Sequence, residues 1–144
     1  MQIFRIKNWR MENIDDDVRR LVISCPKLRS LILEPLNQTS ISLSTLKTIA
    51  ENCPELRALR TPMDTSTIPP FDTTSSKSVR HNLELLAVWS GRPPTQTTLE
   101  FQIQMTRHLD FILPNLKSLT VDPEDATWSG IRDLLKLCQD ARRV

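Results

Sequence analysis

Two stretches of this sequence carry the pattern that decides the fold: CPKLRSLIL at residues 25–33 and CPELRALRT at residues 53–61. Their Cys-Pro pairs lie 28 residues apart, and each leading leucine is followed three positions later by another leucine. Related stretches follow as LELLAVW at residues 83–89 and PNLKSLTV at residues 114–121. Backward extrapolation places Met1, Phe4 and Ile6 at the same apolar positions, so repeats begin near residues 1, 28, 56, 83 and 116.

Each copy predicts a short β-strand. The form L-x-x-L-x-L ends in two apolar residues separated by one residue, which is typical of a strand with one buried face. We therefore expect strands near residues 3–7, 30–34, 57–61, 84–89 and 117–121. One buried ladder is expected from Leu31, Leu59, Leu86 and Leu119.

Helical patterns lie between these strands, with apolar residues at spacings of three and four. The first is expected to begin at Asp15 as its cap, the second at Ser42 or Ser44, and the others to span residues 98–113 and 129–141. The expected inward-facing residues are Val18, Leu21, Val22 and Cys25; Leu46, Ile49, Ala50 and Cys53; Leu99, Ile103, Leu109, Ile112 and Leu113; and Ile131, Leu134, Leu135 and Cys138.

Strand, loop and helix in repeated succession predict an α/β fold, specifically a leucine-rich-repeat solenoid. Neighbouring strands should run parallel because helical crossovers join them. We expect a single domain over residues 1–144, with a curved parallel β-sheet on the concave face and helices on the convex face. Residues 62–80, rich in serine, threonine and proline, predict an irregular loop, and residues 90–98 a second one.

Composition excludes several function classes. The net charge of +2 is too small to favour nucleic acid or an anionic membrane as a partner. No apolar run approaches the roughly 20 residues that span a bilayer, and the N-terminus lacks a signal-peptide pattern. Three cysteines suit a reducing compartment, so a cytoplasmic or nuclear location is expected. The two glycines, Gly91 and Gly130, are too sparse for a phosphate-binding glycine loop.

Candidate catalytic and metal-binding residues are few. Cys25 and Cys53 occupy equivalent repeat positions without C-x-x-C spacing, so they predict small buried residues at helix ends, not zinc ligands. His81 and His108 are isolated in the sequence, and His108, beside Asp110 on a helical pattern, predicts a surface or partly buried side chain and not a general base. Residues 124–125 predict a turn and a helix cap. We therefore expect no enzyme, no metal or cofactor, and no small-molecule substrate.

The cysteine-containing copies also carry a family resemblance. The residues concerned are Cys25-x-x-Leu28-x-x-Leu31-x-Leu33, followed by Ile41-x-Leu43-x-x-Leu46-x-x-Ile49-Ala50-x-x-Cys53. They resemble the cysteine-containing leucine-rich repeats of F-box proteins. The chain as a whole, low in glycine and punctuated by proline, is similar to the large and divergent F-box families of fungi. Two departures are Ile41-Ser42-Leu43 in place of the usual Ile-Thr-Asp turn and Thr61 at an expected leucine position. The resemblance covers nearly the whole chain, strongly over residues 15–60 and loosely elsewhere, and it implies only the substrate-recognition half of a ubiquitin-ligase adaptor.

The outward face of the predicted sheet is the candidate partner-binding surface, because residues between the inward leucines point away from the helices. Three outward columns are expected: Ile3, Ser30, Ala58, Leu85 and Ser118; Arg5, Ile32, Arg60, Ala87 and Thr120; and Lys7, Glu34, Pro62, Trp89 and Asp122. Large aromatic residues and arginine are enriched among binding hot spots. The candidate contact residues are Arg5, Ile32, Glu34, Arg60, Leu85, Trp89 and Asp122.

Two function classes remain open from the sequence. The first is a protein-binding module with an unidentified protein partner, matching the substrate-recognition repeats of an F-box-like adaptor. The alternative is a truncated structural repeat fragment, or a generic repeat scaffold, with no role in ubiquitin ligation.

Overall fold

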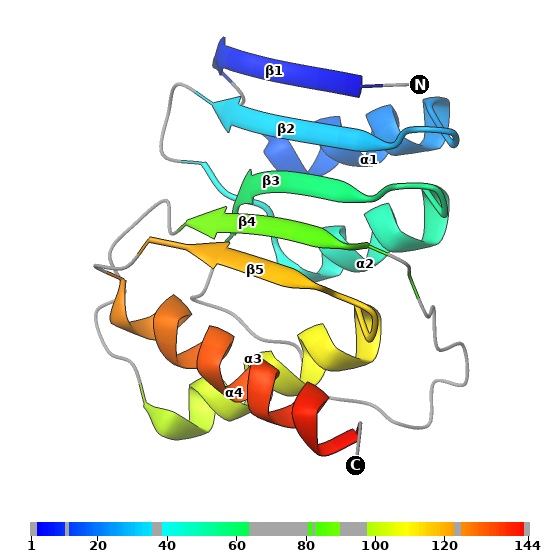
Figure 1. Cartoon of the computed structure of the whole chain (residues 1–144). Coiled ribbons are helices and arrows are strands. Elements are labelled where there is room, and N and C mark those ends of the chain that lie inside the picture. Colours follow the sequence, from blue (N-terminus) through cyan, green and yellow to red (C-terminus); the bar gives the residue numbers. More distant parts are fainter. Residues whose placement is uncertain are drawn as a thin grey trace.

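The computed structural model describes residues 3–10, 12–35, 39–63, 81, 83–89, 98–122 and 125–142 (Figure 1). Its elements are β1 (Ile3–Trp9), α1 (Ile14–Ser24), β2 (Ser30–Pro35), α2 (Leu43–Asn52), β3 (Ala58–Pro62), β4 (Leu85–Trp89), α3 (Leu99–Ile112), β5 (Ser118–Val121) and α4 (Ala126–Arg142).

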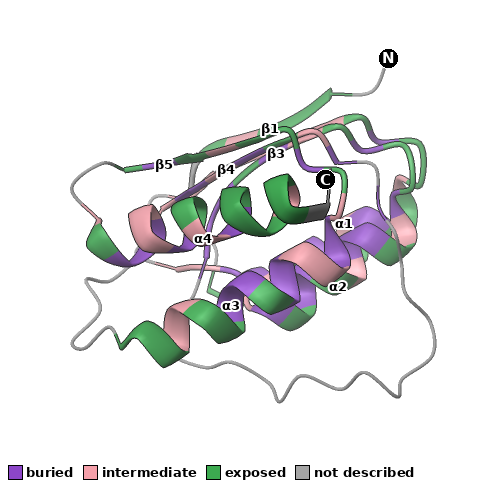
Figure 2. Ribbon diagram, turned by 60° about the horizontal axis from the view of Figure 1, so that its bottom comes forward, coloured by how far each residue is buried: buried purple, intermediate pink, exposed green. Residues whose placement is uncertain are grey.

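The strands form one five-stranded sheet in the order β1-β2-β3-β4-β5, and every neighbouring pair runs parallel. The four described helices lie on one face of this sheet, and the opposite face carries no described helix (Figure 2). The α/β class and the parallel strands are as expected from the repeats. Strand bounds differ from the expected ones by one or two residues.

The strand β3 continues beyond its expected end and corrects the loop prediction. Pro62 belongs to β3, and Met63 is fully buried in an isolated parallel bridge with Ile41. The Met63 amide donates to the Trp89 carbonyl at 3.0 Å, and the Ile41 amide donates to the Pro62 carbonyl at 3.0 Å. The expected loop at residues 62–80 was therefore wrong at its first two residues, which continue the sheet. Residues 64–80, and residues 90–97 of the second expected loop, lie outside the described part of the chain.

Polar side chains cap three of the described helices, and two of these caps, Ser42 and Asp125, are as expected from the sequence. The Ser42 hydroxyl accepts a hydrogen bond from the Thr45 amide at 3.3 Å, so Ser42 caps α2. In the same manner the Thr98 hydroxyl accepts from the Phe101 amide at 3.1 Å at the start of α3. Asp125 accepts from an amide in the first turn of α4, confirming it as a cap.

Asp15 is not the cap of α1 that the sequence predicts. The helix begins at Ile14, and Asp15 lies in its first turn, where its carboxylate reaches the neighbouring helix instead. One Asp15 oxygen accepts from the Ser42 amide at 3.0 Å, from the Ser42 hydroxyl at 3.4 Å and from the Thr45 hydroxyl. A carboxylate is favourable here because the free amides at the start of α2 carry partial positive charge. Asp15 therefore joins α1 to α2.

The core lies between the sheet and the helices. The leading leucines Leu28, Leu56, Leu83 and Leu116 are all buried. In the expected inward ladder, Leu31, Leu59 and Leu86 are buried, whereas Leu119 is only half-buried. Leu119 differs because β5 is an edge strand of the described sheet and has a neighbouring strand on one side only.

Several helical residues were wrongly expected to face inward. Leu99 and Ile103 of α3 are exposed, as is Cys138 of α4. Helix α4 starts earlier than expected, at Ala126, and its fully buried Trp128 belongs to the core. The reason is that α3 and α4 pack against each other, so their mutual contact selects which faces are covered.

The contact between α3 and α4 is close at one point. A Cβ atom added at Gly130 would lie 2.4 Å from the Gln102 side-chain Oε1. Glycine at this position in α4 therefore leaves room for the end of a glutamine side chain from α3.

Candidate functional site

The outward columns expected on the sheet face are confirmed where the pairing register defines them. Residues of the first two columns are direct register partners across all five strands. In the third column, Lys7 is paired with Glu34 and Pro62 with Trp89. Pro62, expected to point outward, is buried, and Asp122 lies exposed one residue beyond β5.

Four of the candidate residues come together on the sheet face, where Arg5 and Arg60 lie beside the Glu34 carboxylate and Trp89 lies beside Arg60. The Glu34 Oε1 lies 3.6 Å from the Arg60 Nε and 4.0 Å from the Arg5 Nη2. The Arg60 guanidinium carbon also lies 5.7 Å from the centroid of the Trp89 ring. The guanidinium of Arg60 is thus held by a carboxylate and by an aromatic face. We call Arg5, Glu34, Arg60 and Trp89 the arginine cluster.

The strands position these side chains from four different repeats. Arg5 and Arg60 occupy one outward column, with Ile32 half-buried between them on β2. Glu34 lies two residues farther along β2 and Trp89 ends β4, so both belong to the next outward column. Because successive outward residues lie two positions apart, the four side chains can meet only when β1, β2, β3 and β4 are aligned as observed.

The arginine cluster contributes little to folding and is suited to binding. Exposed ion pairs contribute about 0–1 kcal/mol each, and the side chains of Arg5 and Arg60 are more than half exposed. An arginine already oriented by neighbours loses less freedom when it binds a carboxylate or phosphate. Arg60 therefore presents hydrogen-bond donors to solvent at little entropic cost.

The remaining candidate residues lie apart from the arginine cluster. Leu85 is 52% exposed at the start of β4, in the same column as the exposed Ile3. Asp122 lies at the β5 edge of the sheet. The structure thus brings together Arg5, Glu34, Arg60 and Trp89, and it leaves Leu85 and Asp122 at other places on the same face.

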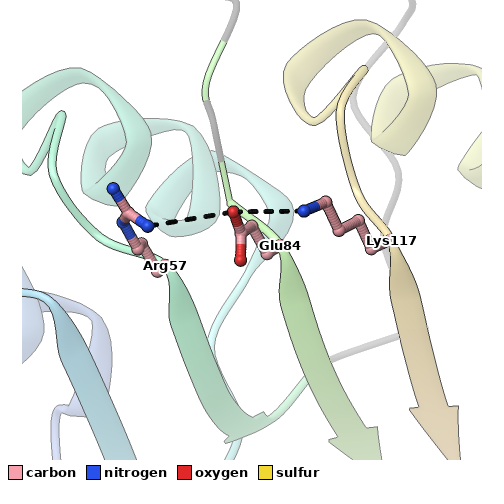
Figure 3. Close-up of polar contacts among 3 residues, drawn as sticks. All are labelled: Arg57, Glu84 and Lys117. Atoms are coloured by element: carbon pink, nitrogen blue, oxygen red, sulfur yellow. Dashed lines mark hydrogen bonds and ion pairs between the residues drawn. The ribbon is translucent and has the colours of Figure 1, made fainter.

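A second row of charged residues crosses the amino ends of the strands. This row was not predicted from the sequence. Glu84 Oε1 lies 4.0 Å from Arg57 Nη1 and 3.5 Å from Lys117 Nζ (Figure 3). These residues each stand one position before the first outward column, so the repeat alignment places them together. Their backbones also join the strands, because the Glu84 amide donates to the Arg57 carbonyl and the Lys117 amide to the Glu84 carbonyl. This row links three repeats at their turns.

The cysteine positions form a structural column, and His81 belongs to it. The Cys53 thiol donates to the Cys25 carbonyl at 3.4 Å. His81 follows Cys53 by 28 residues, as Cys53 follows Cys25, and its Nε2 lies 2.6 Å from the Cys53 carbonyl oxygen. A carbonyl only accepts, so Nε2 carries the proton. His81 was expected to be isolated, and this expectation was wrong; the 28-residue spacing was the signal that locates it.

No catalytic group emerges from this column. Burial raises the pKa of the Cys53 thiol to about 11, and the neighbouring Cys25 adds to the rise, so Cys53 remains a neutral thiol near neutral pH. His108 was expected at the surface or partly buried, and this expectation was wrong, because His108 is buried in α3. Within the described ranges, no group of three or more histidine, cysteine or acidic side chains could hold a metal ion.

Comparisons with protein-family models, curated proteins and solved structures found no match. No helix in the described part of the chain is long and apolar enough to cross a membrane.

Proposed function

We propose that this protein is a non-catalytic protein-binding module whose partner contacts the outward face of the sheet. The observation that carries the proposal is the arrangement of Arg60 between Glu34 and Trp89 on that face. Arginine and tryptophan are the residue types most enriched among binding hot spots. The described helices all cover the opposite face, so the strands supply a broad surface with ordered backbone (Figure 2).

The repeated geometry supports a more specific architecture, a leucine-rich-repeat solenoid with the sheet as its concave face. Successive repeats use the same positions for the same contacts: leading leucines in the core, and Cys25, Cys53 and His81 in one column. Solenoids of this kind present extended concave surfaces to their partners.

Within this proposal, the resemblance to cysteine-containing repeats of F-box proteins supports a role in recognising a substrate for ubiquitin ligation inside the cell. The partner would carry a carboxylate or phosphate for Arg60 and an apolar group for Trp89. A scaffold with no ubiquitin-ligase role is the competing function, and it predicts that no partner depends on these two residues.

Affinity capture from the native cell, with mass spectrometry, tests the proposal. We expect Arg60→Ala and Trp89→Ala each to weaken capture of the same partner by about 1–2 kcal/mol or more, with little change in melting temperature. The matched control is Arg19→Ala, which removes an exposed arginine from α1 on the helix-covered side of the sheet.

Two outcomes would contradict the proposal. If Trp89→Ala lowers the melting temperature while Arg60→Ala leaves capture unchanged, Trp89 serves packing and the sheet face is not the contact surface. If all three variants capture the same proteins equally well, partner binding lies elsewhere. Ubiquitylation of the captured partner, followed with and without Arg60→Ala, tests the adaptor role separately.

A further inference from the structure

The open edge of the sheet at β1 borders an apolar groove. The groove, with a volume of about 340 Å³, lies between β1 and α1. Phe4 and Ile6 line it from the strand and Val18 and Leu21 from the helix, with Asp17 and Arg20 among the polar residues at its sides. In the described part of the chain β1 pairs with β2 only, so its other edge offers unpaired backbone groups.

Comparison along one inward column shows what this edge lacks. Leu31, the register partner of Phe4 on β2, is fully buried, whereas Phe4 is 37% exposed. Likewise Leu33 is fully buried and its partner Ile6 is only half-buried. Interior strands have a neighbour on both sides, and β1 has one among the described strands. The groove is therefore shaped like the space that one more strand would fill.

The charge of β1 indicates what that strand carries on its other face. Arg5 and Lys7 point outward from β1, and Lys7 forms no ion pair with any described residue. Glu34, the register partner of Lys7, already lies near both Arg5 and Arg60. Opposite charges facing each other across neighbouring strands are favourable, and like charges are not. The outward side of β1 thus favours an acidic neighbour.

We propose that the β1 edge binds an extended segment of a partner protein, which adds to the sheet as a sixth strand beside β1. Apolar side chains at alternate positions of the segment enter the groove against Phe4 and Leu21. Acidic side chains at the intervening positions face Arg5 and Lys7. Strand addition of this kind derives affinity from main-chain hydrogen bonds and specificity from pockets for alternate side chains.

Self-pairing of two β1 edges does not fit the same observations. An antiparallel pair of β1 strands centred on Ile6 would place Arg5 of one copy opposite Lys7 of the other, and a pair centred on Arg5 would place the two arginines opposite each other. Both arrangements bring like charges together, which is destabilising. A partner segment with the opposite charge avoids this conflict.

Fluorescence anisotropy with designed peptides tests the inference. The probe is a labelled peptide of alternating valine and glutamate with the length of β1, 7 residues, compared with a valine–lysine peptide of equal length. We expect the lysine peptide to bind about tenfold more weakly. Lys7→Glu, at an exposed position, should narrow or reverse this preference.

Two substitutions on one helix separate the groove from general charge effects. Leu21→Asp places a charge in the groove and should abolish binding of the glutamate peptide, whereas Ile23→Asp, at a position that is 64% exposed, should leave it unchanged. Melting curves identify a variant that fails to fold, and Lys7→Glu then provides the decisive comparison. Partners whose capture depends on Arg60 should still bind Leu21→Asp, so this inference and the proposed function can fail separately.

Three results would overturn the inference. The first is equal binding of the glutamate and lysine peptides. The second is glutamate-peptide binding that a folded Leu21→Asp variant retains. The third is concentration-dependent self-association that Leu21→Asp removes, because a second copy of the chain would then occupy the groove.

Discussion

Leu86→Ala and Leu119→Ala, two identical substitutions in one column, should differ strongly in their cost to stability. Leu86 lies on β4 between Leu59 and Leu119 and is buried. Loss of three buried carbon groups costs about 2.4 kcal/mol at ~0.8 kcal/mol each, and the cavity left behind raises the total to roughly 3–5 kcal/mol. Leu119, half-buried on the edge strand β5, loses about half of the transfer energy and leaves no enclosed cavity, so about 1–1.5 kcal/mol is expected.

Urea denaturation followed by circular dichroism measures both values. With a slope of about 2 kcal/mol per M, the midpoint should fall by roughly 1.5–2.5 M for Leu86→Ala and by about 0.5–0.7 M for Leu119→Ala. Tryptophan fluorescence, to which the fully buried Trp128 contributes, provides a second probe of the same transition. Equal costs for the two variants, or an unmoved midpoint for Leu86→Ala, would refute the assignment of β4 to the interior and β5 to the edge.

Three further outcomes follow from contacts described above. Asp15→Asn should lower the free energy of unfolding, measured by urea denaturation, by about 1–3 kcal/mol, because the carboxylate accepts three hydrogen bonds at the start of α2. The control Asp16→Asn, at an exposed position, should change the free energy of unfolding by under about 0.5 kcal/mol. The free energy of unfolding should decline as pH rises from 9.0 towards about 11, because the Cys53 thiol ionises more readily in the unfolded chain. Cys53→Ala should remove this part of the pH dependence. If the free energy of unfolding of Cys53→Ala falls with pH as steeply as that of the unmodified chain, the raised pKa is contradicted. Gly130→Ala should stabilise the protein by about 0.5–1 kcal/mol more when Gln102→Ala is also present, because alanine then raises the helix propensity of α4 without a clash against the glutamine side chain. Thermal melts of the single and double variants measure this difference. Simple additivity of the two stability changes would argue against the contact.

The register of the sheet was accessible from the repeats because two simple periodicities determine it. Side chains alternate strictly along a strand, and helical crossovers force neighbouring strands to be parallel, so equivalent repeat positions must become neighbours. The columns through Arg5 and Arg60 and through Ile3 and Leu85 therefore match the observed pairing. The same spacing also contained the place of His81, although a change of residue type concealed it.

Other features depended on contacts between elements that periodicity does not describe. Leu99, Ile103 and Cys138 fit a helical stripe in the sequence, yet they are exposed because α3 and α4 cover each other along different faces. Asp15 is a residue type that commonly caps helices, but its carboxylate accepts hydrogen bonds at the start of the next helix, since the free amides of α2 lie within reach.

The sequence by itself determined the strands, their parallel order and the outward columns of this protein, because local alternation and a repeat of about 28 residues impose them. Only the tertiary structure decided that Glu34 joins Arg5 and Arg60, that Arg60 lies over Trp89, and that a groove opens beside β1. These features depend on distances of a few ångströms between side chains from different repeats. Such distances follow from packing against neighbours in space, and the periodicity of the sequence does not specify them.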